Sequence, residues 1–161
     1  DEYRALITKL RAWWPGVTLA TDVIVGFCGE TDEEFAHLLD LLREVRFDVV
    51  HVAMYSPRQG TLSYKWEDDI PLALKKERLH AVEAVQQSIS LELNQAVVGT
   101  TQEILLEERQ EQGERMLWKG RTRGNKIVFC AADENSQPGD MRPVRIDRAS
   151  AWSLQGTLLA G

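Results

Sequence analysis

Apolar side chains recur at helical spacing in three stretches of the chain, and each stretch predicts an amphipathic helix. Pro15-Gly16 ends the first stretch. Thr31 and Glu34 have the spacing of a capping box at the start of the second, and Pro71 stands near the start of the third. The apolar positions expected to face a core are Tyr3, Leu6, Ile7, Leu10 and Trp14 in the first helix, Phe35, Leu38, Leu39, Leu42 and Val45 in the second, and Leu79, Val82, Ile89 and Leu93 in the third.

Two runs rich in β-branched and apolar residues flank the second helix: Val17 to Phe27, and Phe47 to Tyr55. Within the first run, Val23-Ile24-Val25 predicts a strand that is buried on both faces. Strand, helix and strand in this order form the unit of a parallel sheet. We therefore expect the loops that follow the two strands to meet at one edge of that sheet.

The pattern changes after Gly99, where short strands follow one another closely with turns between them. This spacing predicts a small antiparallel barrel, and we place the domain boundary near Gln95–Gly99. The fold class is thus α/β over residues 1–95, followed by an all-β domain over residues 96–161. The predicted strands are Glu103–Glu107, Met116–Arg121, Lys126–Cys130, Val144–Ile146 and Ser153–Leu158, with turn signals at Gln112-Gly113, Gly124-Asn125 and Pro138-Gly139-Asp140.

Charge is distributed unevenly over the 161 residues, whose net charge is -6. Up to Asn94 there are 10 lysines and arginines against 16 acidic residues, and afterwards there are 9 against 9. This balance argues against a general nucleic-acid binder but leaves the second part room for a local basic patch. No membrane-spanning run, secretory signal or lipidation motif is visible, so we expect a cytoplasmic protein with no membrane partner. Because Asp1 already leads into a helix, we expect a piece of a longer protein with an incomplete first domain.

The two cysteines, Cys28 and Cys130, lie far apart, and no CxxC pair is present. The spacing predicts two free buried thiols and no zinc or iron–sulfur site built from cysteine. His51 is expected to pack within its strand, and His37 and His80 are expected on helix surfaces.

Two loops that follow the predicted parallel strands are candidates for a ligand site. Gly26 to Glu30 contains two glycines, which let a ligand approach the backbone; a plain tight turn onto the capped helix is the alternative. Tyr55 to Thr61 contains Arg58, whose guanidinium suits a carboxylate or phosphate; a surface arginine in a turn is the alternative. On neighbouring parallel strands the two loops would share one mouth.

A cationic hairpin is predicted in the second part, where Lys119, Arg121, Arg123 and Lys126 lie within eight residues and Trp118 stands beside them. Cations that hold phosphates next to an aromatic ring that stacks a base are typical of RNA contact on a small barrel. A solvated hairpin rim is the alternative. The patch would be extended by Arg142, Arg145 and Arg148, whereas Trp152 is expected to fill the core.

In this order the segments resemble the radical-SAM methylthiotransferases over essentially the whole chain. Thr21 to Thr31 is similar to the family's "TDIIVGFPGET", and Cys28 stands where the family has proline. The other matching segments are Arg46-Phe47-Asp48 with Tyr55 to Thr61 ("RFD…YSPRPGT"), Lys76 to Leu79 with Gln86 ("KKERL…Q"), Gly120 to Lys126 ("GRTRxNK" of the TRAM domain), Gly139-Asp140, and Ala151 to Gly156.

The resemblance implies the C-terminal portion of a radical-SAM partial (β/α) barrel, followed by a small all-β, OB-like TRAM barrel. It implies a transferase that methylthiolates C2 of N6-isopentenyladenosine next to the anticodon of tRNA. The "YSPRxGT" loop and the "GRTRxNK" hairpin favour this member of the family. A relative that acts on threonylcarbamoyladenosine in tRNA stays open. A non-catalytic RNA-binding module and a small-molecule α/β enzyme with a barrel appendage also stay open.

The resemblance also implies S-adenosylmethionine and two 4Fe–4S clusters in the full-length protein, with the cluster ligands absent from this chain. The chain alone is therefore expected to be inactive, and we expect a monomer that contacts the tRNA anticodon region. No catalytic residue or metal ligand is assigned. The residues expected in the adenosylmethionine pocket are Ile24, Val25, Gly26, Phe27, Gly29, Arg58 and Thr61, and those expected to contact RNA are Trp118, Lys119, Arg121, Arg123 and Lys126.

Overall fold

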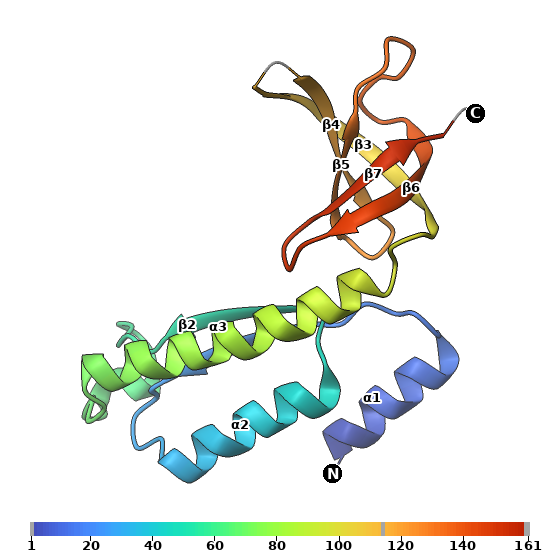
Figure 1. The fold of residues 1–161 in the computed structure, drawn as a ribbon. Helices are drawn as coiled ribbons and strands as arrows, with labels where there is room; N and C mark the ends of the chain where they lie inside the picture. The colour runs from blue at the N-terminus through green and yellow to red at the C-terminus, as the bar shows by residue number, and fades with distance from the viewer. Residues whose placement is uncertain (1, 114, 160–161) are drawn as a thin grey trace. The chain divides into compact units, whose positions relative to one another are not determined.

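A computed structural model of the chain describes residues 2–113 and 115–159. The chain divides into two compact units, Asp1–Ile89 and Ser90–Gly161, which we describe separately. The first unit is mixed α/β, and the second contains a closed β-barrel (Figure 1). No helix in the described part of the chain is long and apolar enough to cross a bilayer.

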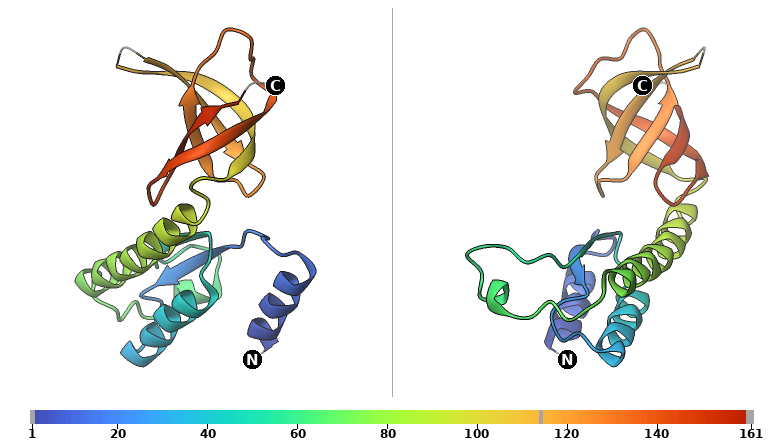
Figure 2. Two further views of the ribbon diagram at one scale, coloured as in Figure 1. Left: turned by 45° about the vertical axis from the view of Figure 1, so that its right-hand side comes forward. Right: turned by 90° about the vertical axis from the view of Figure 1, so that its left-hand side faces the viewer.

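A two-stranded parallel sheet lies at the centre of the first unit, as the strand–helix–strand pattern predicts. Its register runs from Ala20 opposite Val49 to Val25 opposite Met54. The long connection from the second strand to the last helix carries a short 3₁₀ helix (Figure 2). The elements are α1 (Glu2–Trp13), β1 (Ala20–Val25), α2 (Asp32–Val45), β2 (Val49–Met54), η1 (Leu62–Lys65) and α3 (Leu72–Gln95), whose last turns belong to the second unit.

The capping box predicted at Thr31 and Glu34 is confirmed. The Thr31 hydroxyl accepts from the backbone N–H of Glu34 at 3.2 Å, and the Glu34 carboxylate accepts from the backbone N–H of Thr31 at 2.9 Å. These bonds satisfy donors that a helix start leaves unpaired. The helix ends at Arg46, which takes a left-handed conformation with φ 53°.

The sheet is buried on one face only, so the expectation that Val23-Ile24-Val25 is buried on both faces was wrong. Val25 is fully buried in the core with Leu42 and Val82. On the other face, Ile24 is 56% exposed. Alternate strand residues point to opposite faces, and the helices of this unit cover one of them. His51 also lies on the open face and is exposed, not packed as expected.

Helix α1 contributes little apolar burial, in contrast to the stripe predicted for it. Ile7 is its buried residue, whereas Leu6 is 52% exposed. Polar contacts to the end of α2 hold it in place: Arg4 pairs with Glu44 at 2.8 Å, and Arg11 donates to the carbonyl of Val45 at 2.6 Å. Two further members of the predicted stripe, Tyr3 and Trp14, are also exposed.

Five strands close a barrel in the order β3-β4-β5-β7-β6. All five predicted strands are present, with β3 and β6 longer than expected. One difference from the antiparallel prediction is the β5–β7 pair, which is parallel. The strands are β3 (Thr101–Gln112), β4 (Arg115–Thr122), β5 (Ile127–Ala131), β6 (Met141–Ala149) and β7 (Leu154–Leu158).

The barrel core is built from inward-facing residues of all five strands, and Trp118 is its largest buried side chain. Gly120 next to it approaches β3 so closely that a Cβ there would overlap the carbonyl oxygen of Leu105. The two tryptophans exchange their expected places: Trp118 is fully buried, and Trp152, expected in the core, is 63% exposed. The remaining core residues are Ile104, Leu106, Val128, Cys130, Val144, Ile146 and Leu154.

Candidate functional site

The loops after β1 and β2 meet at the carboxyl edge of the sheet, as their positions predict. The backbone N–H of Tyr55 donates to the carbonyl of Val25 at 2.9 Å. The Phe27 ring lies edge-on to Tyr55, with centroids 4.8 Å apart, and edge-on to Trp66 at 5.7 Å. We call this edge, formed by residues 26–30 and 55–66, the strand-end mouth. It gathers three aromatic rings at one edge of the sheet, and an aromatic lining suits a small organic ligand.

Gly26 begins the first loop of the mouth and cannot be replaced there without a clash. Its φ is +68°, and a Cβ would overlap the Lys75 side chain. Its N–H donates to Glu30 Oε2 at 2.7 Å, and the N–H of Gly29 donates to Asp69 at 2.8 Å. Carboxylates of the chain itself therefore hold this glycine loop in shape.

Arg78 of α3 holds the first loop in place through ion pairs with two carboxylates. Its side chain is 3% exposed and donates to Glu30 Oε2 at 2.6 Å and to Asp32 Oδ1 at 2.7 Å. Burial alone would lower the pKa of Arg78, but the hydrogen bonds to Asp32 and Glu30 outweigh it and raise the pKa. The guanidinium therefore stays charged, and Glu30 links it to the backbone of Gly26.

Lys75, one turn earlier on α3, fastens the second loop in the same way. Its ammonium donates to the carbonyl of Tyr55 at 3.3 Å and pairs with Asp68. The ammonium also lies 5.2 Å from the centroid of the Tyr55 ring. The sequence reasoning missed both cations. The signal that could have found them is a lysine and an arginine three residues apart on one helix face, with carboxylates in both strand-end loops.

The residues predicted for the adenosylmethionine pocket are only partly gathered at this mouth. Phe27 lies at the mouth, and Ile24 projects from the open face of the sheet. The Val25 side chain faces the helix core instead, and the residue is fully buried, so it offers no surface to a ligand. Arg58 and Thr61 are exposed in the second loop, where the Thr61 hydroxyl donates to the carbonyl of Arg58 at 2.8 Å.

The cationic hairpin lies on β4, β5 and the turn between them, and acidic residues of β3 accompany it. Arg121 pairs with Glu107 at 3.2 Å. Arg123 donates to Glu103 at 2.7 Å, yet its side chain remains 80% exposed. The charges face solvent with local partners, so phosphate would have to compete with carboxylates for them. The other two predicted cations, Lys119 and Lys126, pair with Glu108 at 2.7 Å and with the side-chain oxygen of Asn94 at 2.7 Å.

The expectation that Trp118 stacks an RNA base was wrong, because its ring is fully buried in the barrel core. Its indole N–H donates to Asp133 at 3.3 Å, and the Arg109 guanidinium lies 4.6 Å from its ring centroid. The inward-facing register of β4 at position 118 determines this placement.

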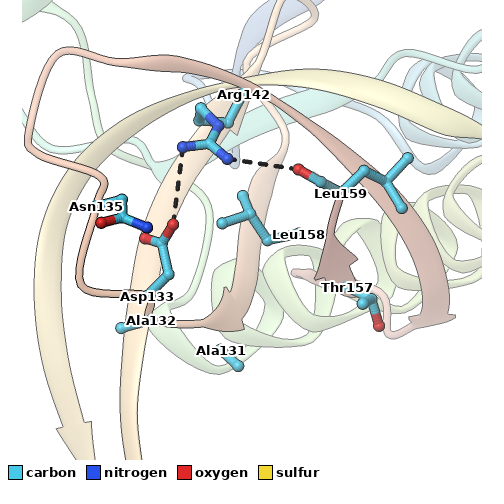
Figure 3. A pocket seen from close by; sticks show the side chains of 8 residues that line it. All are labelled: Ala131, Ala132, Asp133, Asn135, Arg142, Thr157, Leu158 and Leu159. Atoms are coloured by element: carbon cyan, nitrogen blue, oxygen red, sulfur yellow. Dashed lines mark hydrogen bonds and ion pairs between the residues drawn. The ribbon is translucent and has the colours of Figure 1, made fainter. Parts of the chain in front are cut away.

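The loop after β5 borders a hollow of about 640 Å³, in which Arg142 reaches between Asp133 and the carbonyl of Leu159 (Figure 3). The Ser136 hydroxyl donates to Asp133 at 3.0 Å, and this bond, more than the nearby Arg142, holds the pKa of Asp133 below its usual value. Arg145, predicted to extend the basic patch, pairs with Asp147 at 3.0 Å. The contacts of Asp133 and Ser136 with Arg142 tie the loop to the barrel, whereas the Arg145–Asp147 pair lies within β6.

The two thiols occupy different environments. Cys130 is buried in the barrel core, and this burial, followed by the nearby Asp133 carboxylate, raises the pKa of its thiol to about 11. Cys28 is half-buried in the strand-end mouth, so the expectation of two buried thiols holds for Cys130 alone. Among the described residues, no group of three or more His, Cys, Asp or Glu side chains is arranged to hold a metal ion.

Residues 95–159 match the TRAM domain family, so the closed barrel is a TRAM domain. Over its whole length the chain is also related to the methylthiotransferases, which confirms the resemblance read from the motifs. It is 40% identical over 159 residues to the tRNA-2-methylthio-N(6)-dimethylallyladenosine synthase of Acetivibrio thermocellus, covering 99% of this chain and 33% of that protein. It is 42% identical over 161 residues to the synthase of the same name from Moorella thermoacetica, covering 100% of this chain and 36% of that protein. The chain thus spans about a third of the length of these relatives.

Proposed function

We propose that this chain is part of a transferase that methylthiolates C2 of N6-isopentenyladenosine next to the anticodon of tRNA, using S-adenosylmethionine radical chemistry. The observation that carries the proposal is the identity of about 40% across the whole chain to synthases named for that product. A methylthiotransferase for threonylcarbamoyladenosine is the alternative, because it would need the same two units. A non-catalytic RNA-binding module is favoured by the TRAM match alone.

In this proposal the strand-end mouth contributes to the adenosylmethionine pocket. Phe27 and the half-exposed Trp66 offer rings to an adenine, and Ile24 offers an apolar wall beside them. Arg58 has a guanidinium that suits the methionyl carboxylate. When bound, S-adenosylmethionine supplies the methyl group and the source of the radical. The contribution of Lys75 and Arg78 is to hold both loops in place before the ligand arrives, which reduces the entropy lost on binding.

The residues of this chain do not fit a 4Fe–4S cluster, and we derive no step through one. Such a cluster is held by cysteine thiolates, four in the usual case. The chain has two cysteines, and Cys130 is buried in the core with a raised pKa. The proposal therefore places the cluster ligands elsewhere in the full-length protein, and it predicts no turnover by this chain alone.

Binding of tRNA through the cationic hairpin is the part of the proposal that this chain can test alone. The triple variant Arg121→Ala, Arg123→Ala and Lys126→Ala should bind an anticodon stem-loop more weakly than the wild-type chain. Each phosphate contact removed should reduce the slope of log K against log salt by about 0.7 to 0.9. Because each cation has a local partner, we expect a total reduction below about 2. Mobility-shift titrations at several salt concentrations measure both quantities.

The control is Arg43→Ala, which removes an exposed arginine of the first unit, paired with Asp40, and should leave RNA affinity unchanged. If the triple variant bound like wild type, the hairpin would be excluded as the RNA contact. The chemistry needs the full-length protein, reconstituted anaerobically and given tRNA with either modified adenosine. Methylthiolation of the threonylcarbamoyl nucleoside alone would reject the prenylated substrate in favour of the alternative.

A further inference from the structure

The outer face of β4 and β5 presents an aromatic ring that the sequence reasoning did not consider. Trp118 of β4 and Cys130 of β5 point into the core. Because side chains alternate along a strand, Lys119, which follows Trp118, and Phe129, which precedes Cys130, point outward. Phe129 lies directly across from Lys119 on one side and from Gln155 of β7 on the other. A half-buried ring between a cation and an amide is thus fixed on a rigid sheet.

This ring lines a hollow of about 470 Å³ on the barrel surface. That volume falls within the roughly 300–1,000 Å³ of small-ligand clefts. Most of its lining residues are apolar, and the polar ones are Gln112, Arg115 and Gln155. None of the described residues that line it carries a carboxylate, whereas Lys119, Arg121 and Arg123 of the hairpin have acidic partners on β3. Among the described residues that line the hollow, Arg115 is thus the one charged side chain, and its positive charge suits an anionic polymer.

We propose that this hollow binds one unpaired nucleobase of RNA, stacked on the Phe129 ring, with the adjoining phosphate at Arg115. Gln155 would donate to or accept from the base edge. The base must be unpaired because stacking in a duplex covers both of its faces and pairing occupies its edge. The inference rests on the proposed tRNA binding and assigns the aromatic contact that Trp118 cannot make. Arg115 offers a bidentate guanidinium that matches phosphate geometry.

The test uses the full chain and an anticodon stem-loop in which each unpaired loop base is replaced in turn by 2-aminopurine, whose fluorescence falls on stacking. Wild type should quench one position strongly. Phe129→Ala should abolish that quenching and weaken binding about tenfold, because base–aromatic stacking contributes about 1–3 kcal/mol. Its salt slope should stay unchanged, since no charge is removed. Phe129→Trp should retain both binding and quenching.

Two further variants sharpen the result. Arg115→Ala should reduce the salt slope by about 0.7, and Trp152→Ala removes an exposed aromatic outside the hollow and should bind like wild type. Near-UV circular dichroism checks that each variant is folded. If Phe129→Ala is not folded, Phe129→Trp provides the test. Unchanged quenching and affinity in Phe129→Ala, with binding otherwise intact, would overturn the stacking site and leave tRNA binding standing. It is also the result expected if the hollow held a peptide. No binding by wild type would remove the proposed function and this inference together.

Discussion

Cys130 and Cys28 should differ in thiol reactivity, and a single chemical measurement can test this difference. Burial raises the pKa of Cys130 to about 11, so almost all of it is the unreactive thiol at pH 8. We expect Cys130 in the native chain to react with a disulfide reagent about two orders of magnitude more slowly than an ordinary thiol of pKa about 8.5. The half-buried Cys28 should react first. The measurement is the release of reagent chromophore with time.

Cys28→Ser is the control, because it should remove the fast phase and leave the slow one. In urea both thiols should react rapidly, which shows that the fold and not the reagent sets the difference. A fast reaction of Cys130 in the native Cys28→Ser variant would contradict the buried placement.

At the residue scale, the sequence predicted the types of side chain better than their directions. The basic stretch and its neighbouring tryptophan were visible, but a strand alternates inward and outward with period two. A shift of one position therefore exchanges core and surface. Trp118 was assigned the wrong direction for this reason, whereas Trp152 lies in the loop between β6 and β7, where no alternation fixes its direction. Phe129 stayed unnoticed because its outward direction depends on how β5 pairs with β4 and β7.

At the element scale, α3 joins both loops of the strand-end mouth through polar residues that its apolar pattern does not reveal. Its buried positions include Lys75, Arg78, Gln86 and Asn94, which alternate with Val82 and Ile89 along one face. The periodicity predicted the helix and much of its apolar stripe. It could not predict buried cations, because a charge becomes stable inside only when distant carboxylates reach it. Those partners come from loops outside the helix: Glu30 lies 48 residues before Arg78, and Asp68 lies 7 residues before Lys75.

Replacing Arg78 by Met should destabilise the first unit strongly. The change would leave the Glu30 carboxylate, whose side chain is 13% exposed, without its cation. Removing one partner of such a pair costs about 3–5 kcal/mol in the free energy of unfolding. Urea unfolding followed by circular dichroism measures the loss.

The matched control is Arg43→Met, which breaks an exposed pair between Arg43 and Asp40, whose side chains are 57% and 71% exposed. Its effect should lie within about 0.5 kcal/mol. Equal losses in the two variants would mean that the buried network contributes no more than a surface ion pair.

At the scale of the whole molecule, the order of elements was predictable and the surroundings of the sheet were not. Periodicity and turn residues gave strand, helix and strand, then a barrel, and the uneven charge marked the change between them. The sequences of β1 and β2 do not show what surrounds the two strands, so a strand with one open face has the same apolar pattern as a strand buried on both faces. Ile24 and Val49 lie on the open face and are exposed.

Acid should destabilise the chain as a whole, because carboxylates in both units have lowered pKa values. In the barrel, hydrogen bonds from the Ser136 hydroxyl and the Thr157 hydroxyl lower the pKa of Asp133 and of Asp147, respectively. In α2, the Thr31 backbone does the same for Glu34. In the unfolded chain these bonds are absent, and the pKa values return to about 3.8 for aspartate and about 4.5 for glutamate.

A lowered folded-state pKa stabilises the fold above the unfolded-state value, and this stability is lost as the pH falls through the folded-state value. The urea midpoint should therefore stay nearly constant from about pH 7 to 5.5 and fall steadily below about pH 4.5. Asp133→Asn removes one titrating group while keeping an oxygen at the Oδ1 position, which accepts from the Trp118 indole and from the Ser136 backbone N–H. Its acid decline should therefore be shallower than that of wild type. Adding Asp147→Asn should flatten the decline again. Parallel declines in all three proteins would show that these hydrogen bonds leave the acid stability of the molecule unchanged.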